Sequence, residues 1–200
     1  MGKGEQTRNL ILDEAVSLAG RVGLEGLTIG ALAARLKLSK SGLFAHFGSK
    51  EDLQLLALKR AQALFQNHVF SGAPEQARGL TRLRALLSTW LASIEADDPG
   101  GASLILSAPA EYDDRPGPVR DLLAAGQREL RGAIAKAIRL GVDEGHLDAQ
   151  TDPWQLTFEL FGIVLAAHHD RRLLQDSRSV ARAHAAIERL IQAHRPSAAA

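Results

Sequence analysis

Residues 36–50, LKLSKSGLFAHFGSK, place small polar and basic residues between two apolar segments with helical spacing. Ser39 can cap a helix of under three turns that buries Leu43 and Phe47, spaced at i and i+4, and ends at Gly48. A helix this short is unstable in isolation, so neighbouring segments must hold it. The stretch therefore predicts a short helix that packs through one face and presents the other.

The rest of the chain also has the apolar spacing of helices, and no useful length shows the period-two alternation of a half-buried strand. Thr28 can cap a helix, Ser49 with Asp52 gives a variant of the capping box, and Asp152-Pro153 starts another helix. We expect an all-α fold of about nine helices, around 11–22, 28–36, 39–47, 49–71, 80–96, 102–112, 119–144, 153–174 and 177–194.

Composition limits the possible functions. The 200 residues include no cysteine, which excludes disulfide scaffolds, thiolate metal sites and cysteine nucleophiles. Without a signal-peptide pattern or an apolar run long enough for a membrane span, we expect a cytoplasmic protein with no membrane partner. Residues 1–50 hold seven Lys/Arg against four Asp/Glu, a net +3, whereas residues 51–200 carry a net −2. The basic excess at the N-terminal end is weakly suggestive of nucleic acid.

The short helix fits a helix-turn-helix, in which the second helix enters the DNA major groove. With Leu43 and Phe47 turned inward, the outward side chains are small or extendable: Lys40, Ser41, Gly42 and Ala45. Lys40 can reach guanine O6 and N7, and Ser41 can bond several bases. Thr28 and Ser39 at helix N-termini suit phosphate oxygens, and Lys50 would add a charged phosphate contact. Taken singly, each of these could instead be an ordinary cap in a helical bundle.

The stretch from about Arg8 to Leu56 resembles the DNA-binding domain of the TetR family of bacterial transcriptional repressors. The motifs that carry the resemblance are GLEGLT at 23–28, SKSGLFAHF at 39–47 and SKEDL at 49–53. In that family the position of Phe44 is often a tyrosine that bonds a phosphate, so we expect Phe44 to pack or to make an apolar contact. His46 matches the family's usual histidine, either as a phosphate donor or as a buried structural residue.

The resemblance implies a helix-turn-helix domain over 1–50 and a helical effector-binding and dimerisation domain over 51–200. Such a protein binds a palindromic double-stranded DNA operator as a homodimer, and a small effector releases it. The expected DNA-binding residues are Thr28, Ser39, Lys40, Ser41, Gly42, Phe44, His46 and Lys50. No cofactor is expected, and the sequence identifies neither the operator nor the effector.

The last two helices are the natural dimer interface, since they carry more apolar residues than one buried face needs. We expect the interface to include Phe161, Val164, Leu165, Val180, Ile187, Leu190 and Ile191; alternatively, these residues pack inside one subunit. An effector pocket for a largely apolar molecule is expected among the fourth to eighth helices. Its expected lining is Phe65, Trp90, Ile94, Leu104, Tyr112 and Phe158.

Three other classes of protein compete with this interpretation. An enzyme is disfavoured, because the sequence has no Gly-x-Ser-x-Gly elbow, phosphate-binding glycine loop or His-Glu-x-x-His pair. A metal-responsive regulator could use His168 and His169 with His184, but adjacent helical positions point about 100° apart, so no metal site is expected. A helical protein–protein adaptor stays open, although the basic face around Lys40 argues against it.

Overall fold

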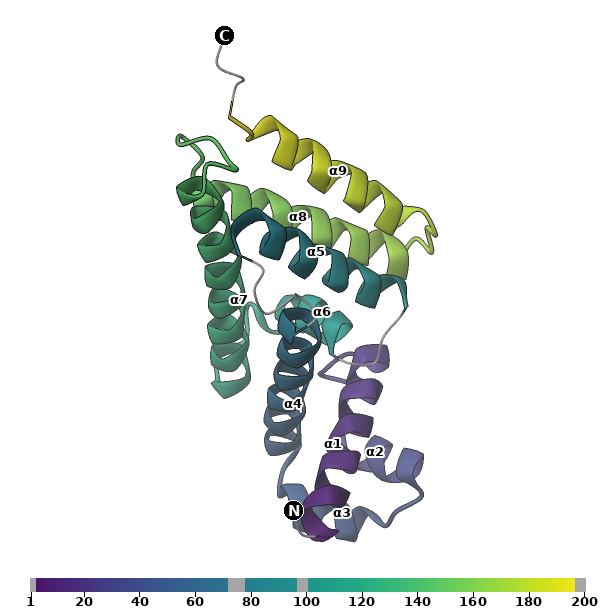
Figure 1. The fold of residues 1–200 in the computed structure, drawn as a ribbon. Coiled ribbons are helices and arrows are strands. Elements are labelled where there is room, and N and C mark those ends of the chain that lie inside the picture. Colours follow the sequence, from purple (N-terminus) through teal and green to yellow (C-terminus); the bar gives the residue numbers. More distant parts are fainter. Residues whose placement is uncertain (1–2, 72–77, 97–100, 197–200) are drawn as a thin grey trace. The chain divides into compact units, whose positions relative to one another are not determined.

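The computed structural model describes residues 3–71, 78–96 and 101–196, and all regular structure in these ranges is helical. Their helices are α1 Lys3–Val22, α2 Ile29–Leu36, α3 Lys40–Phe47, α4 Lys50–Ser71, α5 Gly79–Glu95, α6 Ala102–Tyr112, α7 Pro118–Asp143, α8 Pro153–Arg172 and α9 Ser179–Ala193 (Figure 1). The all-helical prediction is confirmed. The connections expected after residues 71 and 96 fall largely on 72–77 and 97–100, which lie outside the described residues.

The chain forms two compact units: residues 1–66 with 98–126, and residues 67–97 with 127–200. The expected division at residue 50 therefore does not separate compact units. The first unit includes α6, because α6 begins directly against α4: a Cβ at Gly101 would lie 2.6 Å from the carbonyl oxygen of Ala61. Gly101 also has a φ of +96°, so the sequence needs glycine at this entry.

In the first unit, local caps and a shared core position α2 and α3. The Thr28 hydroxyl accepts a hydrogen bond from Ala31 N at 3.1 Å. Lys37 ends α2 in the left-handed conformation, and Leu38 N donates to Ala33 O at 3.0 Å, which closes the turn before α3. Leucines and a phenylalanine from α1 to α4 are buried together, each contributing roughly 1.5–3 kcal/mol to stability; they include Leu24, Leu27, Leu32, Leu43, Phe47 and Leu53.

In the second unit, α5, α8 and α9 lie side by side (Figure 1). Trp90 of α5 is buried, and its ring centroid lies 5.8 Å from that of Phe161 on α8. Arg84 of α5 donates two hydrogen bonds to Glu188 of α9, at 3.0 and 2.8 Å. Among the described residues, no helix combines the length and the apolar content that crossing a membrane requires.

Candidate functional site

The α3 helix has the orientation expected from its sequence. Leu43 and Phe47 are buried, whereas Lys40, Ser41, Gly42, Phe44 and Ala45 are exposed. Ser39 caps the helix, since its Oγ accepts from Gly42 N at 3.1 Å and from the Ser41 hydroxyl at 3.3 Å. A Cβ at Gly42 would lie 3.0 Å from that Oγ, so glycine keeps the cap uncrowded. The outward face therefore carries small and extendable side chains beside the exposed ring of Phe44, which allows a close approach to base edges.

The first turn of α2 joins this face. One shallow hollow is lined by Ile29, Gly30, Lys40, Ser41, Phe44, Ala45 and Lys50, with no carboxylate among these described residues. The Lys40 side chain reaches back over Gly30, where a Cβ would lie 3.3 Å from the lysine Cε. Positive charge thus lies beside the N-terminal end of α2, which itself favours anions. The combination suits DNA phosphates and electronegative base edges.

Two alternatives left open by the sequence are resolved by exposure. Phe44 is 57% exposed, so it does not pack in the core, and its ring is available for an apolar contact. His46 is also exposed, with its ring tilted 56° to Phe47 at 6.2 Å, and is therefore not a buried structural residue. Both side chains stand on the outward part of α3.

Lys50 is not free in the way the sequence suggests, because its Nζ donates to Glu25 Oε1 at 2.7 Å. Glu25 Oε2 accepts from the Tyr112 hydroxyl at 3.0 Å and lies 3.2 Å from Arg115. The hydrogen bond from Lys50, followed by that from Tyr112, holds the pKa of Glu25 below its ordinary value. Burial, then the bond to Glu25, raises the pKa of Tyr112 well above its ordinary value. A phosphate would have to compete with Glu25 for Lys50.

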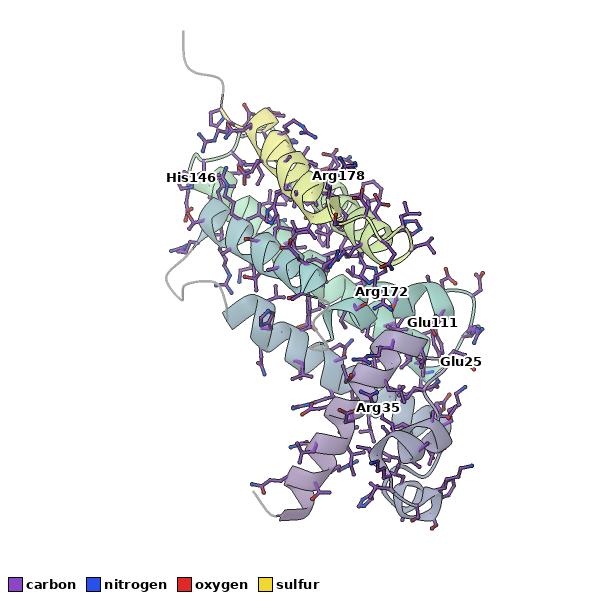
Figure 2. The ribbon with its side chains drawn as sticks, turned by 90° about the vertical axis from the view of Figure 1, so that its right-hand side faces the viewer. Glu25, Arg35, Glu111, His146, Arg172 and Arg178 are labelled. Carbon is purple, nitrogen blue, oxygen red and sulfur yellow. The ribbon has the colours of Figure 1, made fainter. Side chains whose placement is uncertain are left out.

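Glu111, at the end of α6, is a residue that sequence reasoning missed. Its carboxylate accepts from Leu24 N at 3.0 Å and from Glu25 N at 2.8 Å, and Figure 2 shows Glu111 beside Glu25. Gly23, with φ +83°, permits this approach, because a Cβ there would lie 3.0 Å from both carboxylate oxygens. Glu111 thus ties α6 to the loop that leads into α2. No local signal could reveal a contact between residues 87 positions apart.

The residues expected to line the effector pocket fall in different places. Phe65 and Leu104 are buried in the first unit, and Trp90 and Ile94 are buried in the second. The Tyr112 hydroxyl belongs to the Glu25 cluster. Phe158 is 73% exposed, so the expectation that it faces an internal pocket is not met. Helical spacing alone did not indicate which apolar face of α8 turns inward.

The expected dimer residues need a similar correction. Five of them are buried within the chain, by their own subunit's packing: Phe161, Val164, Val180, Ile187 and Ile191. Leu165 stays exposed and Leu190 half-exposed. The outward face instead holds an apolar groove between α8 and α9, lined by Phe158, Glu159, Gly162, Ile163, Ala166, Ala186, Arg189 and Leu190. The second apolar face expected on α8 is thus the one that carries Trp154 and Phe158, both exposed.

The three histidines considered as metal ligands differ in exposure. His168 is buried, His169 and His184 are exposed, and His169 Nδ1 lies 3.3 Å from Asp170. Across residues 3–71, 78–96 and 101–196, no three His, Cys, Asp or Glu side chains form a group that could hold a metal ion.

The comparisons with known proteins cover both units. A family model described as "Bacterial regulatory proteins, tetR family" matches residues 11–56, and one described as "Tetracyclin repressor-like, C-terminal domain" matches residues 79–187. The HTH-type transcriptional regulator HbdR of Aromatoleum sp. (strain CIB) is 27% identical over 139 residues, 68% of this chain. The chain spans 57% of that relative's length.

Two solved structures have a similar fold. A TetR transcriptional regulator from Chloroflexus aurantiacus is 25% identical, with a TM-score of 0.83 over 96% of each chain. AibR, in complex with isovaleryl coenzyme A and operator DNA, is 24% identical, with a TM-score of 0.72 over 91% of this chain and 96% of that one. At 24% identity, the similarity to AibR shows a shared fold alone.

Proposed function

Since the chain belongs to the TetR family of DNA-binding transcriptional regulators, we propose that it binds a palindromic operator as a homodimer and that a small effector releases it. The family consists of regulators rather than enzymes. The single observation that carries the proposal for this chain is the outward face of α3, where Lys40 and Ser41 stand exposed above the buried Leu43 and Phe47.

In this proposal α3 lies in the major groove. Lys40 bonds guanine O6 and N7, Ser41 bonds a neighbouring base edge, and Phe44 contacts a thymine methyl group. The N-terminal turns of α2 and α3, at Thr28 and Ser39, receive phosphate oxygens. His46 donates to a phosphate from the same face. Lys50 exchanges Glu25 for a phosphate, and the cost of breaking that ion pair is small because both side chains are over two-fifths exposed.

The proposed dimer contact is the groove between α8 and α9. A single helix-turn-helix makes too few contacts for tight specific binding, whereas two copies read two half-sites. The groove carries Glu159 on α8 and Arg189 on α9, so a two-fold axis could bring opposite charges together across an apolar centre. We therefore place Phe158 and Leu190 at the subunit contact, with Leu165 beside them.

The proposed effector site is in the helical part of the chain after α4, in the region of Trp90 and Ile94. AibR, a protein of similar fold, was solved with isovaleryl coenzyme A and operator DNA, which supports a small organic effector for this chain. We propose that α6 is the moving element, and that Glu111 transmits its movement to the loop at Gly23–Glu25. That loop precedes α2, so its movement would change the presentation of α3.

Selection of bound sequences from a random duplex pool tests the proposal. We expect a palindrome of two half-sites spaced about one helical turn or a multiple of it apart. Enrichment of nothing, or of a single half-site, would contradict it.

A salt titration separates a regulator from a protein–protein adaptor. Duplex affinity should fall steeply with added salt, because each phosphate contact releases a counterion, and Lys50→Ala should flatten this dependence. Lys59→Ala, an exposed lysine farther along α4, is the matched control. Equal affinity at low and high salt would favour the adaptor.

A further inference from the structure

Arg131 of α7 is a half-buried cation in an apolar place. Its guanidinium carbon lies 3.8 Å from the centroid of the Phe161 ring, and Phe161 in turn contacts the buried Trp90. Desolvation lowers the pKa of Arg131 below its ordinary value. All three residues belong to the second compact unit. A positive charge is therefore held against the aromatic interior of the helical domain.

No carboxylate of the described residues forms an ion pair with this guanidinium. Within the described part of the chain, the polar partners of Arg131 are the backbone and side-chain oxygens of Gln127, both bonded to one terminal nitrogen, Nη1, at 3.3 and 2.7 Å. By contrast, Arg84 pairs with Glu188 and Arg60 with Asp13. Both bonds of Arg131 use Nη1, and neither uses Nε or Nη2.

The contacts of Arg131 use the face of its guanidinium and one terminal nitrogen. A guanidinium stacked on a ring uses its face, whereas its edge carries the N–H groups that form paired bonds to an oxyanion. The contact with Phe161 and the bonds of Nη1 to Gln127 hold the guanidinium in place without using its Nε and Nη2 edge. Uncompensated charge of this kind is costly unless a partner arrives, and an anionic ligand would supply it.

We propose that Arg131 binds the acidic group of the effector, and that the effector is an organic acid whose carboxylate or phosphate is joined to an apolar body. This inference rests on the proposed effector-responsive function and adds the chemical class of the ligand. Phe161 and Trp90 provide the aromatic surroundings for the apolar body.

The test compares ligands that share a body and differ in charge. Calorimetry on the full chain would measure 4-phenylbutanoate, its neutral primary amide 4-phenylbutanamide, and 4-phenylbutyl phosphate. We expect the acid to bind at least about tenfold more tightly than the amide, as expected for a hydrogen bond to a charged group. The acid and the phosphate ester distinguish a carboxylate from a phosphate as the recognised group.

The decisive variant is Arg131→Gln, which should remove the preference for the acid over the amide. Arg131→Met, with a long apolar side chain, provides a second neutral variant if the first does not fold, and thermal unfolding checks both. Arg139→Gln, on the exposed side of α7, should keep the preference.

The outcomes separate the acidic class of the ligand from the effector response itself. An amide that binds as well as the acid and releases operator would overturn the acidic class and leave the effector-responsive function standing. Retention of the preference in Arg131→Gln would also overturn the inference. If none of the three probes binds or releases operator, both the inference and the effector proposal fail.

Discussion

Helices α3 and α8 each carry two phenylalanines three residues apart, one buried and one exposed. On α3, Phe47 is 3% exposed and Phe44 is 57% exposed. On α8, Phe161 is 8% exposed and Phe158 is 73% exposed. The buried member of each pair holds its helix in place, so the exposed member must be understood from its neighbours.

Those neighbours differ sharply. Phe44 shares its hollow with Ile29 and Ala45, but its charged neighbours are two lysines, Lys40 and Lys50, and this basic setting suits DNA. Phe158 shares its groove with apolar and small residues and with one charge of each sign, Glu159 and Arg189, and this setting suits a second copy of the same surface. The same residue type on two faces therefore indicates two different partners, and exposed apolar area alone does not say which.

The largest effect is expected from removing a buried member. Phe47→Ala should lower the free energy of unfolding by about 3–5 kcal/mol, because it leaves a cavity under α3. Phe44→Ala, its exposed neighbour, should change stability by less than about 0.5 kcal/mol while weakening operator binding. Chemical denaturation of both variants measures the difference. Equal destabilisation would show that the inward face of α3 has been misassigned.

The next effect concerns the exposed member on α8. Phe158→Asp should weaken the dimer by roughly 2 kcal/mol per protomer or more, since it places a charge in a buried apolar contact. Sedimentation at micromolar concentration should then show monomers, and operator affinity should drop with the dimer. Leu173→Asp, which changes an exposed apolar residue outside the groove, should leave the dimer intact. A dimeric Phe158→Asp protein would rule out this face.

A smaller effect is expected where α6 meets the loop before α2. Both carboxylate oxygens of Glu111 accept from backbone N–H groups, and Glu111→Gln replaces one of them with an amide nitrogen, which cannot accept. We therefore expect a loss of about 1–2 kcal/mol in stability. Asp114→Asn, in the exposed turn that follows, is the matched control. Thermal unfolding compares the two. If Glu111→Gln is as stable as wild type, its contacts to Leu24 and Glu25 do not hold the loop.

The smallest effect is a pH dependence at Glu25. Because its pKa is lowered in the folded chain, its contribution to stability is present above the ordinary value of 4.5 and is lost as pH falls through the lowered value. The side chain is 49% exposed, so solvent screening limits the contribution to below about 1 kcal/mol. Unfolding measured from pH 6 downward should show a steeper acid loss for wild type than for Glu25→Gln. Parallel curves would contradict this sign.

Much of the fold could be predicted from the sequence because its signals are local. The caps at Thr28, Ser39 and Asp152 accept the expected backbone hydrogen bonds. Ser49 Oγ accepts from Asp52 N, as the capping pattern indicates, and the Ser49 hydroxyl donates to the Asp52 carboxylate. Leu43 and Phe47 set the inward face of α3 by spacing alone. These features depend on residues three or four positions apart.

The predictions that failed concern residues whose partners are distant in the sequence. Helix α8 is apolar on two faces, and its packing against α5 and α9 decides which face is buried. The sequence therefore did not show that Phe161 is buried and Phe158 exposed. Lys50 was expected to be free for phosphate, but its partner Glu25 lies 25 positions away. Glu111 and Arg131 gave no signal, since their environments are created by other helices.

The most direct test of the central claim, that the outward face of α3 reads base edges, is the ratio of affinities for the selected operator and a random duplex at fixed salt. Wild type should prefer the operator by about a thousandfold or more. Lys40→Ala should reduce that ratio by at least about tenfold, as expected from the loss of one base contact in each half-site. An unchanged ratio in Lys40→Ala would show that this face does not specify the sequence.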